Sequence, residues 1–149
     1  MTILFTHRVL ALLLTVAVVG ESTTARSGRP HQVTVVSTDY AFAVAPTLEH
    51  GPTAFSFENQ GRVRHEMNLV RLKPGVTLDS LLHTPPGPAR RALVEGGGLL
   101  LAEPGEPSPY QLLADLTKGR TYAVVCNLQD APDKPPHTQL GMFASFEVR

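Results

Sequence analysis

The feature that most constrains this chain is the recurrence of short segments in which apolar and polar residues alternate, the two-residue period of a half-buried β-strand. About seven such segments occur, with turn residues between them at spacings of about 8–12 residues. They are residues 32–37, 40–44, 65–72, 110–116, 120–127 and 142–148, with a further one around Phe55 and Phe57. The 149 residues include 12 glycines and 13 prolines, as a turn-rich chain requires. We therefore predict a single all-β domain, a Greek-key β-sandwich.

Residues 73–108 interrupt this alternation. Two short helices are expected there, over 76–82 and 89–95, because prolines separate them and the glycines at 96–98 end the second. We interpret the segment as a surface insertion, rich in proline and glycine, in which the glycine triplet is a flexible connection.

The first 25 residues are typical of a secretory signal peptide. A basic start is followed by a 12-residue apolar run, residues 9–20 (VLALLLTVAVVG), and then by small polar residues. This run is shorter than the ~20 apolar residues of a membrane-spanning helix. We expect residues 1–25 to be cleaved and residues 26–149 to form the domain, exported to the periplasm or secreted; the alternative is an uncleaved N-terminal anchor.

Charge excludes one large class of partners. Thirteen basic residues balance thirteen acidic ones, so no basic surplus is available to bind a phosphate backbone. We expect no nucleic-acid partner, no membrane span after cleavage of the leader, and a monomer.

Cys126 is the only cysteine, which is informative for an exported protein because it cannot form a disulfide within its own chain. Three interpretations remain open for it. It is a buried, inert thiol, one half of an intermolecular disulfide, or a metal-bound thiolate.

Four side chains with metal-binding capacity lie at the ends of predicted strands. His65 begins one strand, Cys126 ends another, His137 lies in the following loop and Met142 begins the last strand. Antiparallel neighbours joined by a loop bring Cys126 and Met142 to the same end of the sandwich. Two imidazoles and a thiolate, with a weak axial thioether, form the ligand set of type 1 copper.

The segments around these residues resemble the cupredoxins, the fold of plastocyanin and azurin. Residues 59–65 (NQGRVRH) are similar to the N-x-G-x-x-x-H approach to the first copper histidine, and residues 122–126 (YAVVC) with 137–142 (HTQLGM) are similar to the closing motif. The resemblance implies one type 1 copper ion, with His65, Cys126 and His137 as equatorial ligands and Met142 as the axial ligand.

Two features depart from the small electron-carrying cupredoxins. Ten residues (NLQDAPDKPP) separate Cys126 from His137, where those proteins use only a few. The extra loop length costs only about 0.8 kcal/mol of closure entropy, against metal binding of order 10 kcal/mol. Glu66 follows the first histidine, and strand alternation predicts that its side chain points away from His65.

The remaining candidates have simpler interpretations. Met67 is expected to pack in the core, and His31, His50 and His83 lie in polar or turn segments where we expect no metal. His65 itself has a competing interpretation as a buried core histidine. No sequence pattern of a hydrolase or a metalloprotease is present.

These observations predict an exported one-electron carrier that is not an enzyme. Its electron would leave through a partly exposed edge of His137 to a redox partner protein. The alternatives are a Cu(I) binding, trafficking or storage protein, a metal-free cupredoxin-like interaction domain, and a small copper reductase or oxidase acting with another subunit.

Overall fold

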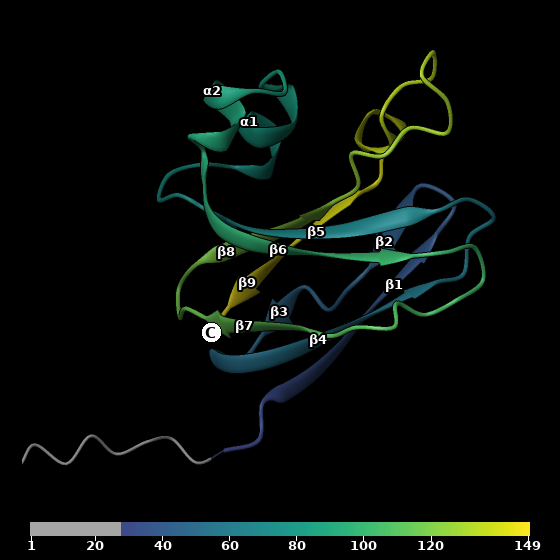
Figure 1. Ribbon diagram of the computed structural model, residues 1–149. Helices are drawn as coiled ribbons and strands as arrows, with labels where there is room; N and C mark the ends of the chain where they lie inside the picture. Colours follow the sequence, from purple (N-terminus) through teal and green to yellow (C-terminus); the bar gives the residue numbers. More distant parts are fainter. Residues whose placement is uncertain (1–27) are drawn as a thin grey trace, which may run out of the picture.

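The computed structural model describes residues 28–149, so the predicted leader lies outside the described residues. Two sheets pack face to face (Figure 1), with strand orders β2-β1-β4-β7 and β3-β9-β8-β5-β6. The strands are β1 (His31–Thr38), β2 (Ala41–Ala43), β3 (Thr47–Leu48), β4 (Gly51–Asn59), β5 (His65–Leu72), β6 (Val94–Ala102), β7 (Leu112–Leu116), β8 (Thr121–Val125) and β9 (Phe143–Val148). The predicted β-sandwich is confirmed.

Most neighbouring strands are antiparallel, but β1 runs parallel to β4 and β3 runs parallel to β9. The parallel pairing of β1 is long, from His31 opposite Thr53 to Ser37 opposite Asn59. β9 pairs with β8 on one side and β3 on the other. The segment between β2 and β4 thus contributes the short edge strand β3 to the five-stranded sheet.

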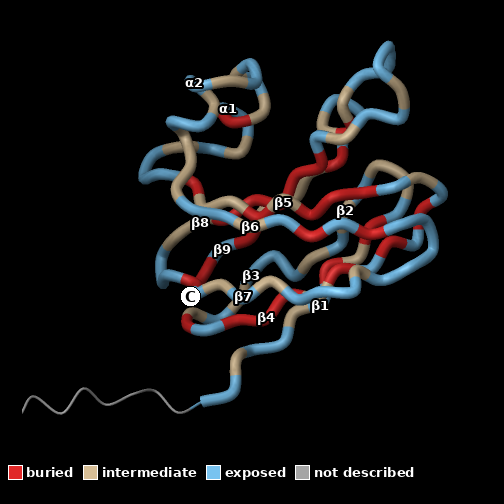
Figure 2. Tube along the Cα trace, viewed as in Figure 1, coloured by how far each residue is buried: buried red, intermediate tan, exposed pale blue. Residues whose placement is uncertain are grey.

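The core lies between the two sheets, where the buried positions of β4, β5 and β8 gather (Figure 2). Aromatic rings from different strands meet in it: Tyr122 stacks on Phe146 with centroids 5.5 Å apart and planes at 4°, and Phe55 lies 6.1 Å from Phe146. Met67 belongs to this cluster, as predicted. Alternation along β5 places Met67 and Leu69 inward, because successive strand residues face opposite sides of a sheet.

Strand β6 corrects the prediction for residues 94–102. The glycines at 96–98 are part of a strand that pairs with β5, and not a flexible connection. A Cβ added to Gly98 would come within 2.3 Å of Leu112 Cδ1, and one added to Gly97 would come within 2.5 Å of the Leu69 carbonyl oxygen. These glycines are needed for close packing, which a local sequence pattern does not reveal.

Two short helices cover the outer face of the five-stranded sheet near one end. Helix α1 (Leu78–His83) begins with a capping box, in which the Thr77 hydroxyl accepts from the Ser80 backbone N–H. Helix α2 (Pro88–Arg91) is shorter than the predicted 89–95, because the chain continues into β6. Leu81 packs into a second apolar cluster with Leu72 and Ala123. Within residues 28–149, neither these helices nor any other has the length and apolar character needed to span a bilayer.

Candidate metal centre

The first histidine is held by the loop between β4 and β5. Asn59, the last residue of β4, donates from its side chain to the backbone oxygens of Val63 (2.8 Å) and Ala102 (3.2 Å) and accepts from the Gly61 N–H (2.9 Å). A Cβ added to Gly61 would lie 3.0 Å from His65 Nε2. The N-x-G-x-x-x-H pattern thus has a physical basis: the asparagine ties the loop together and the glycine makes room for the imidazole.

Backbone hydrogen bonds bring the three C-terminal candidates together. The Cys126 N–H donates to the Met142 oxygen (3.2 Å), the Met142 N–H donates to the His137 oxygen (2.9 Å), and the Thr138 N–H donates to the Cys126 oxygen (2.9 Å). His137 begins the 3-10 helix η1 (His137–Leu140), which ends at Gly141 with φ +98°. These backbone hydrogen bonds therefore hold Cys126, His137 and Met142 close to one another.

Three donor atoms from these two segments converge. Nδ1 of His65 lies 3.2 Å from Nδ1 of His137, and the Cys126 Sγ lies 3.3 Å from Nδ1 of His137 and 4.0 Å from Nδ1 of His65. Metal–ligand bonds of about 2.0–2.3 Å in a trigonal plane place donors about 3.5–3.8 Å apart. The cluster therefore fits a single metal ion, and its two imidazoles and one thiolate are the donor set of a type 1 copper site.

All three side chains are at most 1% exposed, and burial shifts the pKa values of His65 and Cys126. Burial, followed by the neighbouring His137, lowers the pKa of His65, which keeps that imidazole neutral and able to bind metal. Burial also raises the pKa of the Cys126 thiol, although the Glu66 backbone N–H, 3.4 Å from Sγ, favours the thiolate. Metal uptake must therefore release the thiol proton.

Met142 is fully buried. Its backbone is hydrogen-bonded to both Cys126 and His137, so it lies just before β9 at the same end of the sandwich as they do. Within residues 28–149, the other histidines (His31, His50 and His83) are outside the cluster.

The outer edge of His137 is closed, which corrects the prediction of a partly exposed imidazole. The ring nitrogen that faces away from the cluster, Nε2, lies 3.0 Å from Asp130 Oδ1, and the Tyr40 hydroxyl donates to Asp130 Oδ2 (2.5 Å). The Tyr40 hydrogen bond is the main cause of a lowered pKa at Asp130, with a smaller contribution from His137. No motif in the sequence identified Tyr40 or Asp130.

Glu66 is buried although it points away from the cluster. Its carboxylate accepts from the Asn127 backbone N–H (2.9 Å) and from the Asn127 side chain (3.1 Å), and the residue is 8% exposed. Alternation predicted the direction of the side chain. The sequence did not predict that the carboxylate would tie β5 to the residue after Cys126.

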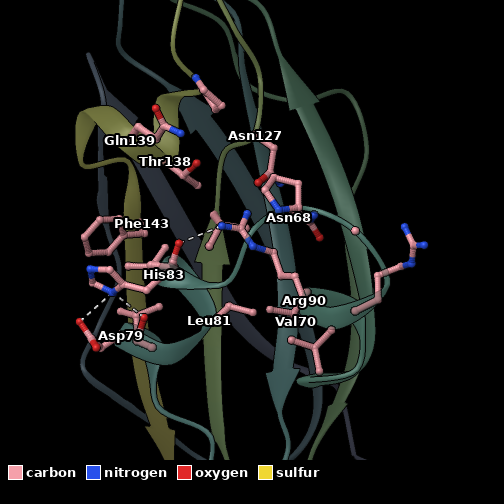
Figure 3. A pocket seen from close by; sticks show the side chains of 18 of the residues that line it. Asn68, Val70, Asp79, Leu81, His83, Arg90, Asn127, Thr138, Gln139 and Phe143 are labelled. Carbon is pink, nitrogen blue, oxygen red and sulfur yellow. Dashed lines mark hydrogen bonds and ion pairs between the residues drawn. The ribbon is translucent and has the colours of Figure 1, made fainter.

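A groove of about 1000 Å³ lies beside the centre, between the helical insertion and the segment that follows Cys126 (Figure 3). Leu81 of α1 lines one part of it, and Asn127 and Thr138 line another. These two residues directly follow Cys126 and His137 in the chain. The residues next to Cys126 and His137 in the chain therefore line this groove.

A two-sheet sandwich with a buried His2Cys centre at one end is the architecture of the cupredoxin fold, and comparison with solved structures agrees. No family model and no curated protein matches the chain. Auracyanin B is 22% identical, with 82% of this chain and 91% of that one covered and a TM-score of 0.51.

Two further auracyanins match less well. The dithionite-reduced auracyanin of Roseiflexus castenholzii is 18% identical, covering 82% of this chain and 99% of that one (TM-score 0.49). Auracyanin A of Chloroflexus aurantiacus, described as a "blue" copper protein, is 20% identical, covering 81% of this chain and all of that one (100%, TM-score 0.48). The chain thus has the fold of auracyanin B, and its function must be argued from its own site.

Proposed function

We propose that this protein is a type 1 copper protein that carries single electrons between redox partners. His65, Cys126 and His137 would hold the copper ion, with Met142 as a fourth ligand. The observation that supports this most strongly is the convergence of the two Nδ1 atoms and Sγ within 4.0 Å of one another, all buried.

When bound, a type 1 copper ion supplies a reversible one-electron couple. The protein's part is to hold its donors in one geometry for both oxidation states. Asn59 fixes the loop before His65, and backbone hydrogen bonds link Cys126, His137 and Met142. Their burial excludes water from the donors. A site whose ligands are all supplied by the protein and closed to solvent suits electron transfer better than substrate binding.

The closed edge of His137 changes the expected route for the electron. Cys126 is bonded directly to Asn127, which is exposed and lines the groove. We take the Cys126–Asn127 backbone as the connection between the thiolate and the surface. The signal-peptide pattern in the sequence of residues 1–25 supports export of this carrier from the cytoplasm.

Copper titration tests the proposal. Purified residues 26–149 should bind one equivalent of Cu(II), develop an intense blue thiolate-to-copper absorption and show a reversible one-electron wave in voltammetry. Cys126→Ser should abolish the blue colour, and His83→Gln, which changes an exposed histidine outside the cluster, should leave it unchanged. A colourless copper complex of the unaltered protein would overturn the proposal.

A competition experiment with a Cu(I) chelator distinguishes this carrier from a Cu(I) trafficking protein. A delivery protein must release its metal readily, whereas here Asp130 and Tyr40 cover the outer edge of His137. We expect slow loss of Cu(I) to a competing chelator. Rapid transfer without a reversible wave would favour trafficking instead.

A further inference from the structure

The hydrogen bonds beyond His137 form a continuous chain. Nε2 of His137 donates to Asp130 Oδ1 at 3.0 Å, because an ionised carboxylate only accepts. The other carboxylate oxygen, Oδ2, accepts from the Tyr40 hydroxyl at 2.5 Å. Both carboxylate oxygens of Asp130 thus accept hydrogen bonds. One bond comes from His137, a candidate copper ligand, and the other from Tyr40, ninety positions away in the chain.

The proton on Nε2 determines which nitrogen of His137 is free. A neutral imidazole carries one proton, so a protonated Nε2 leaves a lone pair on Nδ1. Nδ1 is the atom that faces the Cys126 sulfur at 3.3 Å and the His65 ring at 3.2 Å. Asp130 therefore selects the tautomer that can bind metal at the cluster.

Tyr40 occupies its position at a conformational cost. Among the non-glycine residues in the described part of the chain, it alone has a positive φ, +60°, a conformation that costs about 1–2 kcal/mol. Its ring meets the His137 ring edge-on at 5.0 Å and the His65 ring at 6.2 Å. Strain of this kind persists where surrounding contacts offset it, often at functional sites.

The long loop between Cys126 and His137 supplies Asp130. The His137 N–H donates to the Leu128 oxygen (2.8 Å), and the Lys134 N–H donates to the Ala131 oxygen (3.0 Å), so the loop folds back on itself. The extra length of this loop thus brings a carboxylate to the outer side of the histidine.

We propose that Asp130, held by Tyr40, is a positioning residue that orients His137 toward the metal and lowers the reduction potential of the site. This rests on the proposed copper function. The bound carboxylate makes the imidazole a stronger donor, and its negative charge favours the more positive oxidation state of the metal. Partners of this kind commonly change metal affinity by about 10–100-fold.

Three variants separate orientation from charge. Asp130→Asn keeps an oxygen that can accept from Nε2 but removes the charge. Asp130→Ala removes both. Asp133→Asn is the matched control, because it makes the same charge change in the same loop at an exposed residue.

Asp130→Asn should weaken Cu(II) binding by about tenfold. If Cu(I) affinity is unchanged, the reduction potential rises by about 59 mV. Asp133→Asn should change both quantities much less. Equal shifts in the two asparagine variants would show a general charge effect and overturn the proposed potential tuning.

The effect of Asp130 on the His137 imidazole can be tested without copper. Nitrogen-15 NMR of the His137 ring should show the Nε2–H tautomer in the metal-free full chain and in Asp130→Asn, and a mixture of tautomers in Asp130→Ala. An unchanged tautomer in Asp130→Ala would overturn the positioning role. If the unaltered protein binds no blue copper, the proposed function fails, and the NMR result still decides the role of Asp130.

Discussion

Gly98 of β6 and Leu112 of β7 lie so close that a Cβ on the glycine would come within 2.3 Å of Leu112 Cδ1. β6 and β7 are edge strands of different sheets, so this contact joins the two layers where they meet. The absence of a side chain at Gly98 is therefore a packing requirement.

Gly98→Ala should destabilise the domain by about 1–3 kcal/mol, the usual cost of overpacking. Chemical unfolding would measure this change. Gly28→Ala is the matched control, because a Cβ there meets nothing within 4 Å. Equal stability of the two variants would mean that Leu112 moves aside at no cost.

Asn59→Ala should lower stability by about 2–4 kcal/mol, because the buried groups that it bonds lose their partners. These groups are the backbone oxygens of Val63 and Ala102 and the N–H of Gly61. Copper affinity should fall as well, since the same loop positions His65. Chemical unfolding and copper competition would measure the two effects. Asn68→Ala, at a half-buried residue whose side chain has no hydrogen bond within residues 28–149, should change neither.

Glu95 should contribute stability that depends on pH. Its carboxylate lies 3.0 Å from Arg120 and 3.2 Å from Arg71, and the Arg120 hydrogen bond lowers its pKa below the ordinary 4.5. A carboxylate with a lowered folded-state pKa stabilises the protein above the unfolded value and loses that effect as pH falls through the folded value.

Glu95→Gln should thus be less stable than the unaltered protein at pH 7, and the difference should shrink below pH 4.5. Unfolding curves at several pH values would show this. The exposed Glu106, with no ion pair in the described part of the chain, provides a control as Glu106→Gln. A difference that stays constant with pH would contradict the assignment.

Cys126 should resist thiol reagents in the folded, metal-free protein. It is 0% exposed and burial raises its pKa, so both access and thiolate population are low. Modification by an aromatic disulfide should be orders of magnitude slower than in denaturant. Fast modification of the folded protein would show that the centre opens readily.

Local patterns in the sequence predicted much of the fold. The bounds of β5, 65–72, agree with the structure because alternation of apolar and polar residues follows directly from strand geometry. Strand β6 was missed because three consecutive glycines usually break structure, and here close contacts across the sandwich favour them instead.

In the candidate site, too, local sequence patterns predicted some residues and missed others. Short motifs at strand ends predicted His65, Cys126 and His137, and their donor atoms do converge. Tyr40 and Asp130 were missed because their contact joins residues ninety positions apart. The prediction of an exposed His137 edge was wrong because Asp130, from the loop just before His137, covers that edge and is held there by Tyr40, which is distant in the sequence.

The last strand, β9, bridges β3 and β8, and Met142 immediately precedes it. His65 lies far ahead of Cys126, His137 and Met142 in the sequence. The cluster of His65, Cys126 and His137 therefore cannot form on a fragment that stops before β8, and it is complete only when almost all of the described chain has folded.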